Sequence, residues 1–256
     1  KDATFLICVE KNKPDAIAKL KEALADKPYA RVHELEAIYP QGAKQVTLYN
    51  ATGRVAIAGK RFPAFHAVII NVSSFAKMAE YMETGMPLVE RIVTVDGPGV
   101  KTPKNFIAPI GTRISYLLEQ VELKGEPGKV VIGGPMNGNA VVSVDSPIVK
   151  VSNAVLVFDE KHAVLPDATN CIHCGKCVEK CPINITVWAV YGALQTKDED
   201  AREAKLIDTG VRQCVDCGCC SYICPAHRPL LGWNQEAKGW LKKYAAAKKE
   251  KEEGKN

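Results

Sequence analysis

The sequence contains the same cysteine pattern twice. CIHCGKCVEKCP at 171–182 returns 43 residues later as CVDCGCCSYICP at 214–225, and nine of the ten cysteines fall within these 54 residues. Both segments follow C-x2-C-x2-C-x3-C-P, the spacing typical of proteins that bind two [4Fe–4S] clusters. The repeat therefore requires a fold that brings both segments together around two clusters.

The spacing also indicates which cysteines share a cluster. In two-cluster proteins of this type, three closely spaced cysteines bind one cluster and the fourth, followed by Pro, binds the other. We predict a first cluster held by Cys171, Cys174, Cys177 and Cys224, and a second held by Cys214, Cys217, Cys220 and Cys181. Cys219 stays outside this set because its use would break the spacing, and Cys8 is expected to be an ordinary apolar residue.

Other readings of the cysteines fit less well. Zinc ribbons use two C-x2-C pairs rather than two runs of four, and zinc is the main alternative that the pattern leaves open. Disulfides need an oxidising compartment, which no export signal supports, and a thioredoxin-like motif uses two thiols. His173 and His227 lie in or beside the motifs and are expected to be solvated, with an influence on a cluster potential as the alternative.

The rest of the sequence contains no motif for a different chemistry. G-x-G-x-x-G and G-x-x-x-x-G-K-[ST] are both absent, so neither a dinucleotide fingerprint nor a P-loop is indicated. No catalytic residues are predicted, because no nucleophile–histidine–carboxylate arrangement, metalloprotease motif or carboxylate pair stands out. One-electron transfer is the only chemistry that the residues indicate.

Composition limits the partners and the location. The formal charge of +5 treats every Cys as neutral, and two clusters of about −2 each would nearly cancel it. Nucleic-acid binding is therefore not expected. The chain has neither a signal peptide nor an apolar run long enough to span a bilayer, which predicts a cytoplasmic protein. Its start without Met, inside a strand-like run, suggests a missing N-terminal part.

The pattern along the chain predicts several parts. The opening reads as strand, helix, strand, followed by a strand QVTLY at 45–49 and a helix from about residue 73 to Gly85. Residues 87–160 show a hairpin around Gly-Pro-Gly, a helix near Thr112 and further strands, a β-grasp-like layout. The spacer between the cysteine segments has helical spacing. We expect domains at 1–86, 87–160 and 161–242, and a charged tail at 243–256.

Several segments together resemble the C subunit of the Rnf electron-transport complex. They are VEKNKPDAI, YPQG, PLVERIVTVDG, GGPMNG and the two cysteine blocks, and they occur in the order found in that family. The resemblance implies an α/β plus α chain: a partial Rossmann-like domain related to the flavin subunit of complex I, an SLBB-like β-grasp domain, and a C-terminal helical two-cluster ferredoxin domain.

The resemblance also implies a function. In that family the subunit takes electrons from NADH through FMN and passes them through two [4Fe–4S] clusters, as a peripheral subunit on the cytoplasmic face of the membrane. It implies other redox subunits, a ferredoxin or a flavoprotein as partners. The glycine-rich flavin segment is absent here, and YPQGAKQ is shorter than the usual segment, so FMN is expected only where a further N-terminal segment or a partner completes the site. A flavin-free carrier or docking subunit of another reductase complex is the alternative.

Overall fold

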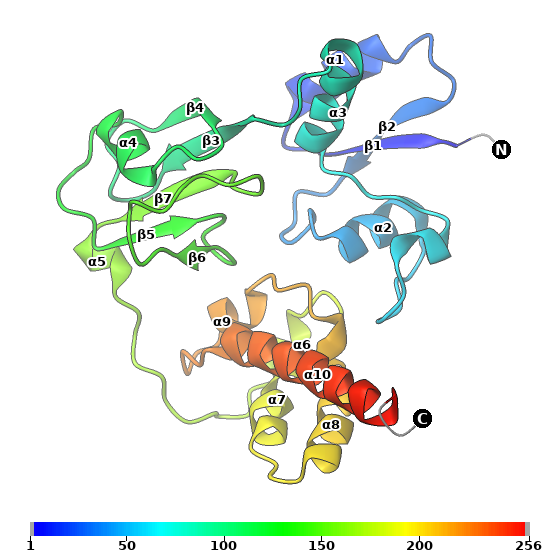
Figure 1. Ribbon diagram of the computed structural model, residues 1–256, viewed down its shortest axis with the longest axis vertical. Coiled ribbons are helices and arrows are strands. Elements are labelled where there is room, and N and C mark those ends of the chain that lie inside the picture. Colours follow the sequence, from blue (N-terminus) through cyan, green and yellow to red (C-terminus); the bar gives the residue numbers. More distant parts are fainter. Residues whose placement is uncertain (1–2, 254–256) are drawn as a thin grey trace. The chain divides into compact units, whose positions relative to one another are not determined.

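The computed structural model describes residues 3–253, which form two units (Figure 1). The first, here called the mixed unit, comprises residues 3–69, 173–223 and 229–253. The second, the sheet unit, comprises residues 70–172 and 224–228. Each unit contains a hydrophobic core of its own.

The N-terminal part of the mixed unit is a strand–helix–strand element. Strands β1 (Phe5–Glu10) and β2 (Ala30–Leu35) pair in parallel and are joined by α1 (Pro14–Ala23). Pro14 stands in the first turn of α1, where its missing N–H costs no hydrogen bond. The structure confirms the strand–helix–strand order expected from the sequence.

The prediction of a strand at 45–49 is wrong. These residues lie in helix α2 (Lys44–Thr52), which is followed by the short 3₁₀ helix η1 (Phe62–Phe65). Val46, Thr47 and Tyr49 favour strands intrinsically, but local hydrogen bonds and packing outweigh that preference. The Thr47 hydroxyl donates to the Gln41 carbonyl oxygen, and Leu48 is buried.

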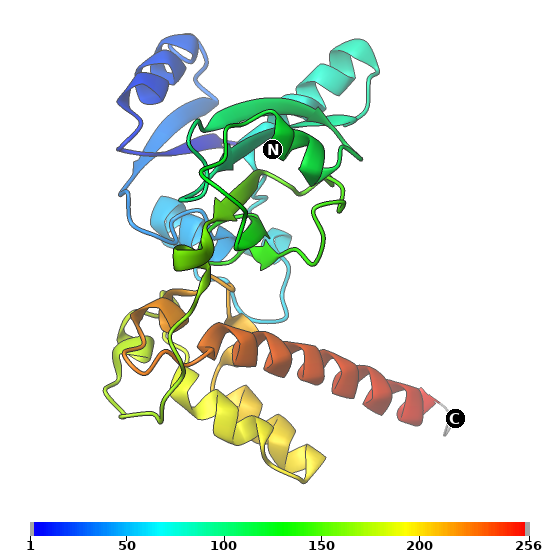
Figure 2. The ribbon, with the colours of Figure 1, turned by 90° about the vertical axis from the view of Figure 1, so that its left-hand side faces the viewer.

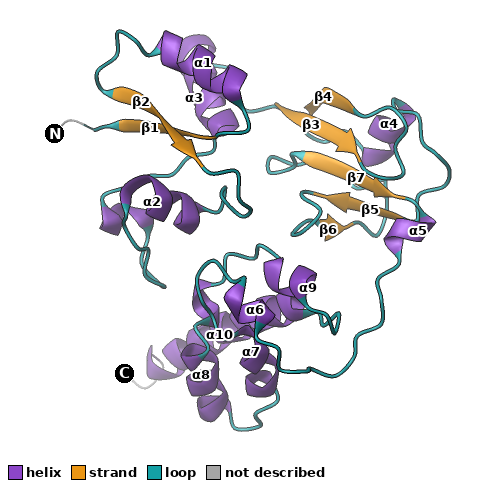
Figure 3. Ribbon diagram, turned by 180° about the vertical axis from the view of Figure 1, so that it is seen from behind, coloured by secondary structure: helices purple, strands orange, loops and turns teal. Residues whose placement is uncertain are grey.

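The sheet unit contains a five-stranded sheet with the order β4-β3-β7-β5-β6 (Figure 3). Strands β3 and β4 form a hairpin, and β7 lies parallel to β3 and antiparallel to β5. The bounds of these elements are α3 (Val72–Thr84), β3 (Glu90–Asp96), β4 (Lys104–Pro109), α4 (Ile114–Glu119), β5 (Lys129–Ile132), β6 (Asn139–Ala140), β7 (Ala154–Phe158) and α5 (Glu160–Ala163).

The core of the sheet unit lies between α4 and one face of the sheet. Alternate residues of β3 and β7 point into this core, as the two-residue period of a strand requires. The fully buried members include Val93, Val95, Ile114, Val155 and Val157. The hairpin, the helix near Thr112 and the strand from Lys129 all follow the order expected from the sequence.

Gly97 is required where β3 turns toward Gly99. Its φ of +121° is strained for any residue with a Cβ, and an added Cβ would lie 2.3 Å from the Val157 carbonyl oxygen. We expect Gly97→Ala to destabilise the sheet unit by about 3 kcal/mol, measured as faster hydrogen exchange in β3 and β7. Gly125→Ala, with open space around the new methyl group, is the control; equal exchange in both variants would contradict the prediction.

The C-terminal part of the mixed unit is helical, as its sequence spacing predicts. The long helix α10 packs along α7 and α8, and the two views agree on this arrangement (Figures 1 and 2). The buried core of this part includes Val190, Leu206, Val211, Ala237 and Leu241. The elements are α6 (Lys176–Glu179), α7 (Val187–Leu194), α8 (Glu199–Asp208), η2 (Val211–Gln213), α9 (Cys219–Ile223) and α10 (Leu230–Glu253).

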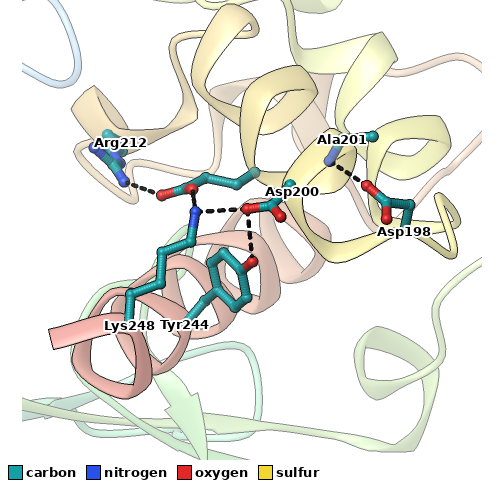
Figure 4. Close-up of polar contacts among 7 residues, drawn as sticks. Asp198, Asp200, Ala201, Arg212, Tyr244 and Lys248 are labelled. Carbon is teal, nitrogen blue, oxygen red and sulfur yellow. Dashed lines mark hydrogen bonds and ion pairs between the residues drawn. The ribbon is translucent and has the colours of Figure 1, made fainter. Parts of the chain in front are cut away.

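A polar network also joins α10 to α8 (Figure 4). The Lys248 ammonium lies 2.6 Å from an Asp200 carboxylate oxygen and 2.8 Å from Glu203, and the Tyr244 hydroxyl donates to Asp200. Hydrogen bonding to Lys248 holds the pKa of the Asp200 carboxyl below its usual range. Solvent screens these exposed charges, so the buried core contributes more to helix packing.

The charged tail expected from residue 243 does not begin at a structural break. Helix α10 continues without interruption through residues 242 and 243 to Glu253, and Tyr244 and Lys248 are bonded to α8. Residues 254–256 of the expected tail lie outside the described residues. None of the helices in residues 3–253 has both the length and the apolar character needed to cross a membrane.

Candidate iron–sulfur centre

The two cysteine segments repeat in backbone conformation as well as in sequence. Three equivalent pairs of positions have left-handed φ angles, a conformation that non-glycine residues seldom adopt. The pairs are His173 and Asp216 (53° and 54°), Gly175 and Gly218 (74° and 81°), and Asn184 and His227 (53° and 49°). A short helix begins at the same place in each segment, α6 at Lys176 and α9 at Cys219. Each segment therefore bends in the same way around its cysteines.

The predicted ligands of the second cluster line one recess of the mixed unit. Cys181, from the first segment, lies there with the three cysteines of the second segment, and Cys217 and Cys220 are buried. Apolar side chains form most of the remaining wall. The lining residues are Cys181, Pro182, Ile183, Ile185, Val187, Cys214, Val215, Cys217, Gly218, Cys219, Cys220, Leu231 and Asn234.

Burial governs the chemistry of these thiols. It raises the pKa of Cys214 and of Cys217 to about 11, and that of Cys220 to about 12. Without a metal these thiols are neutral at pH 7, whereas iron binds the thiolate. Assembly of a cluster here therefore requires the iron ions to displace protons from the thiols.

The predicted ligands of the first cluster are distributed over both units. Cys171 and Cys224 belong to the sheet unit, whereas Cys174 and Cys177 belong to the mixed unit. Within the sheet unit, the Thr169 N–H donates to the Ala226 carbonyl oxygen at 3.0 Å, and the Arg228 guanidinium donates to the Thr169 carbonyl oxygen. The segments that carry Cys171 and Cys224 are thus held side by side.

The donor set of the recess fits an iron–sulfur cluster. No three His, Cys, Asp or Glu side chains in residues 3–253 converge closely enough to hold a single metal ion. The thiolates of a [4Fe–4S] cluster each bind a different iron atom, so they stand around a larger group. Five cysteines from the two segments line the recess within largely apolar walls, namely the four predicted ligands and Cys219.

Helix α10 supplies two residues of this region that the sequence motifs did not identify. The Lys238 ammonium donates to the Cys214 carbonyl oxygen at 3.0 Å and pairs with Asp216 at 2.5 Å. The Asn234 side chain is 1% exposed and lines the recess. The spacing of α10 contained a sign of this role, because Asn234 interrupts the buried series Leu230, Ala237 and Leu241 with a polar side chain.

The N-terminal part of the mixed unit touches the second cysteine segment. The hydroxyl of Tyr39, the first residue of the YPQG segment, donates to the Cys217 carbonyl oxygen at 2.5 Å. Burial, followed by the neighbouring Cys217 and Cys219, raises the pKa of Tyr39, so this hydroxyl stays protonated and remains a donor. Tyr39 thereby fixes the position of one predicted ligand loop.

The residues left out of the ligand set have different surroundings. Cys219 lines the recess beside Cys220, and Cys8 is half-buried in β1. Burial raises the pKa of Cys8. The His173 ring meets the Trp188 ring edge-on, with 5.9 Å between the ring centroids.

Two family models match separate parts of the chain. The Nuo51 FMN-binding domain, known from the 51-kDa protein of complex I, matches residues 2–80, and a 4Fe-4S dicluster domain matches residues 157–227. The second match covers both cysteine segments. These matches, with the cysteine-lined recess, define an iron–sulfur protein of the dicluster class that also carries a flavin-domain segment.

Individual relatives of the chain indicate a narrower family than these two domain matches. The C subunit of the Na⁺-translocating ferredoxin:NAD⁺ oxidoreductase complex of Acetobacterium woodii is 37% identical over 180 residues, 70% of this chain and 41% of that protein. The C subunit of the ion-translocating oxidoreductase complex of Yersinia pestis is 36% identical over 79% of this chain and 33% of that protein. The C subunit of the proton-translocating ferredoxin:NAD⁺ oxidoreductase complex of Clostridium ljungdahlii is 34% identical over 78% and 44%.

The chain is a homologue of the C subunits of ion-translocating (Rnf-type) oxidoreductase complexes. The resemblance found in its sequence is thereby confirmed, as is the mixed α/β architecture with a C-terminal dicluster domain. The chain spans between 33% and 44% of the length of these three relatives.

Proposed function

We propose that the chain transfers electrons through two [4Fe–4S] clusters as the NADH-side subunit of an Rnf-like NADH:ferredoxin oxidoreductase. The observation that carries this proposal is the recess in which Cys181 of the first segment joins Cys214, Cys217 and Cys220 of the second. If each motif formed an independent site, a cysteine of the first motif would not be expected among the cysteines of the second. The shared ligands instead favour two neighbouring clusters.

The proposed ligand sets are the two predicted from the sequence. Cys171, Cys174, Cys177 and Cys224 would hold the first cluster, and Cys214, Cys217, Cys220 and Cys181 the second. The clusters supply reversible one-electron storage when bound. The chain holds them with thiolates, keeps water from the second site with Ile183, Ile185 and Leu231, and fixes its ligand loop through Tyr39 and Lys238.

The finer fold assignments belong to the same proposal. The strand order β4-β3-β7-β5 supports a β-grasp (SLBB-like) domain at 87–160, because β7, the last of these strands in the sequence, lies parallel to β3, the first, and one helix crosses the sheet. The parallel β1–α1–β2 element supports a partial Rossmann-like region at 1–86. The ferredoxin domain would then begin near residue 161 and include all of α10.

The Nuo51 FMN-binding match and the names of the relatives support a proposal about the flavin, the nicotinamide and the partners. We propose FMN and NADH sites that a further segment or a partner protein completes, since the chain lacks the glycine-rich flavin motif. The proposed partners are the other redox subunits of the complex and a ferredoxin or flavoprotein. Attachment to the cytoplasmic face of a membrane would occur through those partners.

The test is whether NADH reduces the clusters. We expect the anaerobically purified full-length protein, loaded with FMN, to show the EPR signals of both reduced clusters after addition of NADH. Dithionite provides the control for cluster integrity. Reduction by dithionite but not by NADH would favour the alternative, a flavin-free carrier, and fewer than about four iron atoms per chain would contradict two clusters altogether.

A further inference from the structure

The side chain of Asn234 is polar, buried and placed among cysteines. Its Nδ2 lies 3.7 Å from the Cys214 sulfur and 4.0 Å from the Cys220 sulfur, within hydrogen-bond range for sulfur acceptors. The residue is 1% exposed, and its position on α10 would suit an apolar residue equally well for packing. Its amide group thus faces two predicted ligands of one cluster.

The other end of the same amide has no hydrogen-bond partner. The Asn234 Oδ1 atom is buried and unpaired among the described residues. An unpaired buried polar atom destabilises the folded chain, because it has lost its hydrogen bonds to water. A purely structural role would be served better by Leu, which has nearly the same shape and no polar atoms. The position therefore carries a polar group that makes its hydrogen bonds only toward sulfur.

We propose that Asn234 is a positioning residue of the second cluster, which raises the reduction potential of that cluster through N–H···S hydrogen bonds to Cys214 and Cys220. The inference rests on the proposed ligand set of this cluster. Reduction adds one electron to the cluster and its ligands, and hydrogen bonds to the sulfur atoms stabilise the added negative charge. The electron comes from NADH by way of the proposed flavin, or from dithionite in a titration, and no proton transfer is needed.

The expected effect is specific to one cluster. In Asn234→Leu, the ratio of reduced to oxidised second cluster at a fixed potential should fall about tenfold, because the hydrogen bonds that stabilise the added negative charge are lost. A tenfold change corresponds to about 59 mV for one electron. Asn234→Asp, which has the same shape and adds a negative charge, should lower the potential further.

The measurement is a redox titration of the full chain, followed by EPR. The matched control is Gln235→Leu, the same kind of change at the next, exposed position of α10. The first cluster serves as the internal reference and should keep its potential. An unchanged potential of the second cluster in Asn234→Leu, with full iron content, overturns the proposal.

A second measurement has its main readout in the wild-type protein, so it does not require the Asn234 variants to assemble their clusters. Wild-type protein with ¹⁵N in its asparagine side-chain amides should show a hyperfine coupling to the reduced second cluster in pulsed EPR. The coupling should persist in Asn184→Asp, which removes the amide nearest to Cys181 along the chain. Its absence in the wild type overturns the proposal. A wild type that binds no iron would instead contradict the proposed function, so the two failures are distinguishable.

Discussion

In a Cys181→Ser variant, the second cluster is expected to be lost or strongly impaired although its three other ligands lie in the other cysteine segment. Cys181 lines the recess with Cys214, Cys217 and Cys220, so its removal leaves that cluster with three thiolates. Cys224→Ser should damage the first cluster in the same way. Iron content should fall from about eight to about four atoms per chain in each variant.

EPR of the dithionite-reduced variants identifies which cluster remains. Cys219→Ser is the matched control, because Cys219 lies in the same recess and is outside the proposed ligand set. It should keep both clusters. If Cys181→Ser loses the first cluster and keeps the second, each segment binds its own cluster and the crossed assignment is wrong.

Removal of both clusters should unfold the cysteine segments and leave the helical core intact. Residues 171–183 and 214–224 contain only two short helices, so little regular secondary structure holds their backbone. Their ordering therefore depends on the cluster. Hydrogen exchange in these segments should rise on the order of a hundredfold after oxidative cluster removal and chelation.

The helices α7, α8 and α10 provide the internal control in the same experiment. Their contacts involve Val190, Leu206 and Leu241, which lie in an apolar core that needs no metal. The strands β3 and β7, with their own core, should also keep their protection. Equal loss of protection in the cysteine segments and in these elements would show that the clusters support the whole chain rather than the segments that bind them.

A dicluster domain was predictable because the spacing of the cysteines is specific to it. Eight thiols at two- and three-residue intervals, each run ended by Pro, leave few arrangements other than clusters, and a dicluster family model matches both segments. The helices of the ferredoxin part and the hairpin of the sheet unit were predictable from periodicity. These features depend on residues close together in the sequence.

The wrong and missing predictions concern residues whose conformation or role depends on contacts with distant parts of the sequence or on competing local preferences. Val46, Thr47 and Tyr49 favour a strand, yet a hydrogen bond to Gln41 and the burial of Leu48 place them in a helix. Asn234 follows the last predicted ligand by ten residues and belongs to no motif, so only its place among buried apolar residues of α10 marks it. Tyr39 reaches Cys217 across 178 residues, a contact that sequence spacing cannot indicate.

The pairing of the segments around Thr169 and Ala226, together with the place of Cys181 in the recess of the second segment's cysteines, bears on biosynthesis. Under the crossed ligand set, neither cluster has four ligands until Cys220 and Cys224 have left the ribosome. The first segment therefore stays reduced and without a complete ligand set during synthesis of the spacer that becomes α7 and α8. Insertion of iron and sulfide is then a late event that acts on both sites together, and a chain ended before residue 214 would retain no complete cluster.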